Sequence, residues 1–158
     1  MYKDEVTETP VMTPEINADA LHDTLVAPMD GRSVALSTVN DAMFSQEILG
    51  QGVGIIPSSN EVYAPVAGVI SAAFETKHAI GITDDAGVEI LIHVGIDTVQ
   101  MGGSGFAYHV EKDARIEKGD HLMSLSIEAI QEHGYDPTTM MVITNSDKFR
   151  RYPCYNRS

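Results

Sequence analysis

Residues 87–99 read Gly-Val-Glu-Ile-Leu-Ile-His-Val-Gly-Ile-Asp-Thr-Val, the strongest structural signal in the chain. Aliphatic residues alternate with Glu, Leu and His, which predicts a strand with two different faces. One face is continuously apolar and belongs in a core: Val88, Ile90, Ile92 and Val94. His93 lies on the other face, so we expect it to stand on a rigid strand and point toward a partly open surface.

The segment before this strand predicts a β-hairpin. Residues 77–83 form a second strand candidate, and Asp84-Asp85-Ala86-Gly87 is a turn sequence. A four-residue loop is common in hairpins and sets the register. The predicted cross-strand pairs are Thr83 with Val88, Ile80 with Leu91, and His78 with His93. In this register, Ile80 and Ile82 share the face of the two histidines.

Two facing imidazoles allow three roles. Neutral ring nitrogens can bind a metal such as zinc, which makes His78 and His93 candidate metal ligands. Alternatively, one ring attacks as a nucleophile while the other donates a hydrogen bond. Both rings can also be purely structural. The sequence keeps all three roles open at this point.

The rest of the chain predicts an all-β fold with one or two short helices. Turn signals recur about every 8–12 residues, as in sandwiches and barrels. A helical turn is predicted at 40–44 with Asn40 as its N-cap, and a helix at 127–133 with Ser126 as its N-cap. Short strands are predicted at 33–37, 53–57, 62–63, 66–73, 121–125 and 140–143. A weak repeat, Ala-Pro-x-x-Gly, occurs at 27–31 and 64–68.

Composition narrows the function classes. A length of 158 residues with 43% hydrophobic residues fits one domain with a core. The net charge of −13 argues against binding nucleic acid or an anionic membrane and suits a basic protein partner. No apolar run is long enough to span a membrane, and the start lacks a signal-peptide pattern. A single cysteine, Cys154, fits a reducing, cytoplasmic compartment.

The two ends of the chain lack the strand patterns of the segment between them. Residues 1–22 mix Thr, Pro, Asp and Glu without periodicity, which predicts a flexible acidic tail or linker. Residues 150–158 are basic at first and show no strand pattern, so we interpret them as an atypical C-terminal tail.

Residues 87–99 resemble the active-site signature of the glucose-type IIA domain of the bacterial phosphoenolpyruvate:sugar phosphotransferase system. The resemblance covers roughly residues 23–149 and includes a series of further segments. These are 27–31, 44–57, 64–68, 74–79, 105–106 and 118–120. Relatives normally continue past Asn145-x-Asp147 into a short helix and a final strand, and the tail at 150–158 departs from that pattern.

The resemblance implies a fold and a chemistry. The fold is an antiparallel β-sandwich, or barrel-sandwich, built from a duplicated hybrid motif. His93 is the residue that is phosphorylated, His78 donates a hydrogen bond to the phosphoryl group, and Thr76 orients His78. The phosphoryl group comes from the phosphocarrier protein HPr and passes to a IIB domain for sugar uptake. No cofactor is required.

The resemblance also implies a partner-binding surface around the histidines. Acidic residues, Asp97 and Asp41, would meet arginines on the donor protein. Apolar residues would dock partners and limit water at His93: Phe44, Phe74, Leu91 and Val99.

Three other interpretations compete with a phosphoryl carrier. A zinc hydrolase would use His78 and His93, but its third ligand is unassigned, and zinc bound there incidentally would draw on a partner's carboxylate. A lipoyl- or biotinyl-type carrier is suggested by 64–70, although the local motif around Lys77 is absent. A non-catalytic regulatory remnant of the family is the third. The remaining histidines are interpreted as surface or structural residues: His22, His109, His121 and His133.

Overall fold

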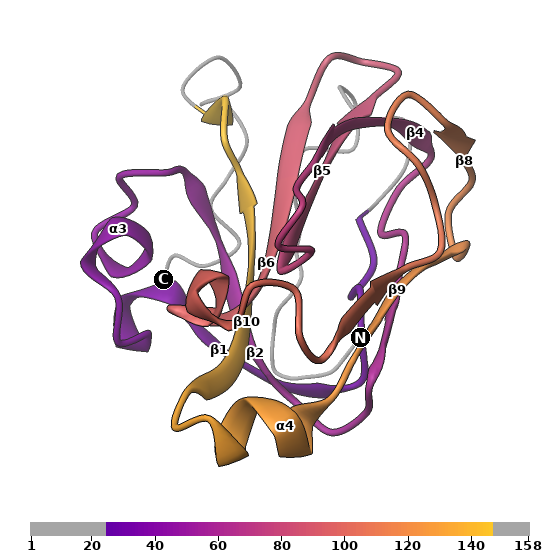
Figure 1. Cartoon of the computed structure of the whole chain (residues 1–158). Coiled ribbons are helices and arrows are strands. Elements are labelled where there is room, and N and C mark those ends of the chain that lie inside the picture. The colour runs from indigo at the N-terminus through magenta and orange to yellow at the C-terminus, as the bar shows by residue number, and fades with distance from the viewer. Residues whose placement is uncertain (1–24, 147–158) are drawn as a thin grey trace.

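The computed structural model describes residues 25–146, and its strands form two antiparallel sheets that pack as a β-sandwich (Figure 1). The seven-stranded sheet has the order β1-β2-β10-β6-β5-β4-β8. Its strands are β1 (Gly31–Ala35), β2 (Gln51–Pro57), β10 (Asp136–Ile143), β6 (Glu89–Ile96), β5 (Ala79–Asp84), β4 (Gly68–Ala73) and β8 (Arg115–Ile116). The three-stranded sheet consists of β3 (Glu61–Tyr63), β9 (His121–Leu125) and β7 (Phe106–Tyr108), in that order. The predicted all-β class is confirmed.

The main core lies between the two sheets. The inward residues of β6, and Val88 just before it, are buried as predicted: Val88, Ile90, Ile92 and Val94 are at 0–1% exposure. Val62 of β3 and Leu122 of β9 close the core from the small sheet, both at 0% exposure. Alternation along β6 therefore fixes its inner face, and His93 takes the outer one.

A second, smaller core covers the outer face of the large sheet near His93. Phe44 of α3 (Ala42–Ser45) packs there with Leu36 of η1 (Leu36–Thr38) and with Ile96 and Met140. Figure 1 shows α3 standing beside β10, away from the small sheet. This second core leaves Leu91 and His93 half-buried rather than open.

The predicted hairpin exists, but the predicted register is wrong by one residue. Thr83 pairs with Glu89, and Ala79 pairs with His93. The cause is the turn: the carboxylate of Asp84 accepts hydrogen bonds from the backbone N–H groups of Ala86 and Val88. This Asx-type closure leaves three residues in the loop instead of four.

The one-residue shift also corrects the face assigned to two isoleucines. Ile80 and Ile82 pair with Ile92 and Ile90 and are buried in the main core, not on the side of the histidines. His78 precedes β5 and so escapes the strand alternation.

Each of the two α-helices begins after a residue whose side chain caps the helix N-terminus. The N-cap of α3 is Asp41, whose side chain accepts from the N–H of Met43, so the prediction of Asn40 is wrong by one residue. Ser126 caps α4 (Ile127–Glu132) as predicted, accepting from the N–H of Ala129. Over residues 25–146, no helix is both long and apolar enough for a membrane span. The predictions for 1–22 and 150–158 lie outside the described residues.

Candidate functional site

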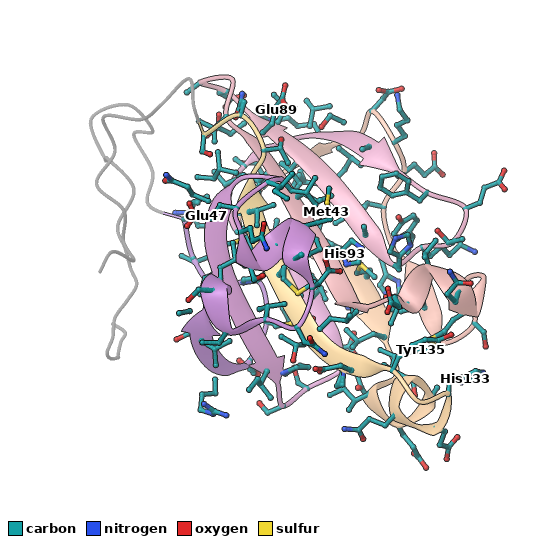
Figure 2. All side chains as sticks on the ribbon, turned by 90° about the vertical axis from the view of Figure 1, so that its left-hand side faces the viewer. Met43, Glu47, Glu89, His93, His133 and Tyr135 are labelled. Atoms are coloured by element: carbon teal, nitrogen blue, oxygen red, sulfur yellow. The ribbon has the colours of Figure 1, made fainter. Side chains whose placement is uncertain are left out.

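His93 has a defined ring orientation. Its Nδ1 lies 2.9 Å from the carbonyl oxygen of Gly95, two residues further along β6. A carbonyl oxygen can only accept, so Nδ1 carries the proton and donates it. The neutral ring then keeps its lone pair on Nε2, which is the nucleophilic atom. Figure 2 views the molecule from the side of α3 and labels His93.

Gly95 can only be a glycine in this conformation. Its φ is +84°, and a Cβ at this position would stand 2.3 Å from Cγ2 of Thr98. Thr98 is fully buried and its hydroxyl donates to the carbonyl of Val94, which closes the chain into η2 (Thr98–Met101). The carbonyl that holds His93 is therefore itself held by a tight turn.

His78 reaches His93 from a turn rather than from a strand. Lys77 has φ +57°, and its N–H donates to the carbonyl of Phe74 over 3.0 Å. The carbonyl of His78 then accepts from the N–H of Val94 at 2.7 Å. The two imidazole centroids are 4.8 Å apart with the rings nearly perpendicular, at 81°. The predicted proximity of the two histidines holds although the predicted register does not.

Thr76 contacts His78, as the family resemblance implies. Its Oγ1 lies 2.8 Å from Nδ1 of His78. A hydroxyl can donate to or accept from that nitrogen, and either arrangement fixes the ring plane. Thr76 and Gly95 thus each hold the Nδ1 side of one histidine, which leaves both Nε2 atoms available for chemistry.

Aromatic rings flank the histidines. Phe44 lies 5.1 Å from the ring of His93, and Phe74 lies 5.8 Å from the ring of His78, both measured between centroids. Phe44 is buried, at 3% exposure, so it forms a wall of the site more than an exposed docking residue. Phe74 is exposed at 42%.

Both histidines favour the neutral form. Burial is the main cause that lowers the pKa of His78 to about 4, and the neighbouring His93 is the smaller cause. Burial also lowers the pKa of His93, opposed by its hydrogen bond to Gly95 and by the negative charges of Asp41 and Asp97. Neutral rings near pH 7 suit a nucleophile and a hydrogen-bond donor.

The other predicted residues surround this pair. Asp97 is exposed with φ +64° at the start of η2, and Asp41 is half-buried at the start of α3. Both carboxylates are close enough to influence His93 electrostatically. Val99 is exposed at 44%, and Leu91 is half-buried on the same strand as His93. The site is an apolar surface with an acidic rim.

Tyr108 is a site residue that sequence reasoning missed. Its hydroxyl donates to the carbonyl of Ala79 and accepts from the N–H of Phe74 at 3.1 Å. It therefore ties both ends of the turn that carries Thr76 and His78. No local sequence signal marks this role, because the contact joins β7 to the turn across 29 and 34 residues of chain.

The histidine pair has no third metal ligand in the described part of the chain. In residues 25–146, no group of three His, Cys, Asp or Glu ligand atoms includes His78 or His93. A catalytic zinc site normally has three protein ligands. The zinc hydrolase interpretation is therefore not supported by this geometry.

Comparison with known proteins identifies the family. The model of the phosphoenolpyruvate-dependent sugar phosphotransferase system EIIA 1 family matches residues 23–149. The chain belongs to this family. The resemblance inferred from 87–99 is confirmed, and a phosphoryl carrier is favoured over a regulatory or zinc-binding remnant.

Relatives of known structure and sequence agree. Glucose permease IIA from Mycoplasma capricolum superposes with a TM-score of 0.73 and 38% identity, over 76% of this chain and 78% of that one. A beta-glucoside-specific EIIBCA component from Bacillus subtilis (strain 168) is 43% identical over 80% of this chain. A glucose-specific EIICBA component from Staphylococcus saprophyticus is 44% identical over 77%.

The curated relatives are much longer proteins. This chain spans about a fifth of their length, 21% and 18% in the two cases above. The family consists of phosphotransferase components that carry a phosphohistidine.

Proposed function

We propose that Nε2 of His93 accepts a phosphoryl group from HPr and passes it to a IIB domain, and that the chain works in the cytoplasm. One observation carries the proposal. Nδ1 of His93 is committed to the carbonyl of Gly95, so Nε2 is a free lone pair beside a second imidazole. As the new bond from Nε2 to phosphorus forms, the bond to the donor breaks, and no water is needed.

His78 stabilises the phosphoryl group in this proposal. If the hydroxyl of Thr76 donates to Nδ1 of His78, the ring proton lies on Nε2 and can be donated to a phosphoryl oxygen. A fixed donor of this kind stabilises charge that develops in the transition state. The low pKa of His78 keeps the ring neutral, so it acts as a hydrogen-bond donor and not as a fixed cation.

The surroundings favour transfer between proteins over loss to water. Phe44 and Leu91 shield His93, while Phe74 and Val99 present apolar area to a docking partner. Asp41 and Asp97 would meet basic residues of HPr. No metal is required, and zinc at His78 and His93 would need a further ligand from outside residues 25–146.

The test is reconstitution with phosphoenolpyruvate, enzyme I and HPr, read by intact mass and a peptide map. One acid-labile phosphoryl group on the peptide that contains His93 is the expected result. His93→Ala should remove the label while the chain remains folded. A folded wild-type chain that takes up no label, or a label on another residue, would refute the proposal.

A further inference from the structure

A second cluster of metal-binding side chains lies on the outer face of the small sheet. Glu61 belongs to β3, His121 begins β9, and His109 follows β7. Their candidate ligand atoms lie within 4.8 Å of one another. Across the described span, 25–146, this is the one such group of three. Two strands, β3 and β9, and the residue directly after β7 therefore contribute one ligand each.

An irregularity in the strand pairing puts His121 on this face. Val62 pairs with Met123 but Tyr63 pairs with His121, so Leu122 is an extra residue in β9. In a regular strand Leu122 would pair with Tyr63, and His121 would share the buried face of Met123. A bulge re-aims the following side chains, and here it turns His121 outward, onto the face of Ser124.

The other strands present their ligands to the same spot. Ser124 pairs with Glu61 on one side and with Ala107 on the other. His109 follows Ala107 by two residues and so shares its face, and its N–H donates to the carbonyl of Leu122 at 2.8 Å.

Hydrogen bonds already converge on one carboxylate oxygen. Oε1 of Glu61 accepts from Nε2 of His121 and from the hydroxyl of Ser124, each at 2.6 Å. Because that hydroxyl has donated its only hydrogen, it accepts from Nε2 of His109 at 2.8 Å. These bonds also hold the pKa of Glu61 below its ordinary value, so the carboxylate is charged at neutral pH.

The rings are held in place by stacking. The imidazoles of His109 and His121 stack with centroids 4.1 Å apart and an interplanar angle of 27°. Tyr63 packs on His121 from the other side, with a centroid distance of 5.2 Å. Both Nε2 atoms point toward the Glu61–Ser124 pair, so little rearrangement is needed to share one ion.

We propose that Glu61, His109 and His121 bind a divalent transition-metal ion, Zn²⁺ in the first instance. Two imidazole nitrogens and one carboxylate form a donor set that zinc accepts, and water or an outside ligand takes the fourth position. On binding, each ring gives the lone pair of Nε2 to the metal and holds its remaining proton on Nδ1. The net charge of −13 favours a cation.

This site is separate from the phosphoryl-transfer site. His93 lies on β6 of the large sheet, on the face covered by α3, whereas the new site lies on β3, β7 and β9. Figure 1 shows β9 and α3 on opposite sides of β6 and β10. The proposal is independent of phosphoryl transfer.

The test is a Zn²⁺ titration of the metal-stripped full chain, followed through the imidazole NMR signals of each histidine and by calorimetry. Saturable shifts at His109 and His121 are expected. Glu61→Gln and His121→Gln should each weaken this response at least about 10-fold. Gln keeps the size of the side chain, and the amide spectrum would verify that the fold is retained.

The control is His133→Gln, which removes an exposed histidine at the end of α4 (Figure 2) and should leave the response unchanged. Zinc that shifts only the rings of His78 and His93 would overturn the proposal. So would an unchanged zinc affinity in Glu61→Gln, because the cluster would then be a surface hydrogen-bond network only.

Discussion

The carbonyl oxygen of Gly95 holds Nδ1 of His93 at 2.9 Å and thereby selects Nε2 as the reactive nitrogen. The two residues lie two positions apart on the same strand, and the turn that follows fixes the carbonyl of Gly95. Transfer chemistry at His93 thus depends on the backbone conformation of a residue without a side chain.

Gly95→Ala should damage both stability and phosphoryl acceptance. An alanine at φ +84° is strained, and its Cβ would collide with Cγ2 of the buried Thr98. We expect a loss of roughly 1–3 kcal/mol in the free energy of unfolding. Urea unfolding would measure it. Gly87→Ala is the matched control, because its φ is +90° but no atom lies within 4 Å of the added Cβ. Equal losses in the two variants would argue against the collision with Thr98.

His78→Ala should impair onward transfer more than acceptance. The free Nε2 of His93 remains, but the donor that stabilises the migrating group is lost. Removing one such donor typically costs about 10²–10³ in rate. Rapid-quench transfer from labelled HPr, and from the labelled chain to a IIB domain, separates the two steps. Equal losses in both steps would contradict the assigned role.

Thr76→Val should reproduce part of that defect. Valine keeps the shape of threonine but removes the hydroxyl that lies 2.8 Å from Nδ1 of His78. The His78 ring would then lose its preferred orientation and tautomer, and onward transfer should slow by roughly 10-fold. An NMR tautomer assignment of His78 in both proteins checks the cause. A normal rate with an altered tautomer would rule out positioning by Thr76.

Asp97→Asn should slow association with HPr. The exposed carboxylate lies at the rim of the site, and asparagine tolerates the same left-handed conformation. We expect the acceptance rate to fall roughly 3- to 10-fold at low salt and the difference to shrink at high salt. Asp113→Asn is the matched control, since Asp113 is also exposed with φ +75° but stands just before β8. A similar drop in the control would indicate a general charge effect.

The pKa of His78 predicts a pH-dependent stability. The folded value of about 4 lies below the ordinary 6.5, so between these values the unfolded chain binds a proton that the folded chain does not. Stability is therefore complete above about pH 6.5 and falls as the pH drops toward about 4. His78→Gln should flatten this slope in urea unfolding at a series of pH values. His133→Gln, at an exposed position, should keep the wild-type slope. A wild-type slope in His78→Gln would contradict the burial of a neutral ring.

The sequence was sufficient for the features set by local alternation. Ile90 and Ile92 predict the inner face of β6, and His93 follows on the outer face. The sequence predicts a turn at Asp84 but not how many residues the loop contains. The side chain of Asp84 accepts hydrogen bonds from the N–H groups of Ala86 and Val88, and these bonds favour a three-residue loop over a four-residue one. The predicted register is therefore wrong by one residue, and the predicted face of Ile80 and Ile82 is wrong with it.

The remaining features depend on contacts between distant segments. His109 and His121 read as unrelated surface residues, and only the extra residue Leu122 in β9 turns His121 toward Glu61. A bulge of this kind leaves no local mark in the sequence. His78 and His93 lie close together as predicted, but the predicted strand register is not the cause. The left-handed conformation of Lys77 turns the chain so that His78 reaches His93.

Tyr108→Phe should loosen the turn that carries Thr76 and His78. The lost hydroxyl leaves the carbonyl of Ala79 and the N–H of Phe74 without their partner. We expect a cost of about 1–3 kcal/mol and slower onward transfer, because His78 would lose its fixed position. Hydrogen exchange at the Phe74 amide and the transfer rate measure the two effects. Tyr63→Phe is the control, since Tyr63 is exposed on β3 of the small sheet and not in the turn that carries Thr76 and His78. If Tyr108→Phe is destabilised but transfers at the normal rate, the tyrosine stabilises the fold without positioning His78.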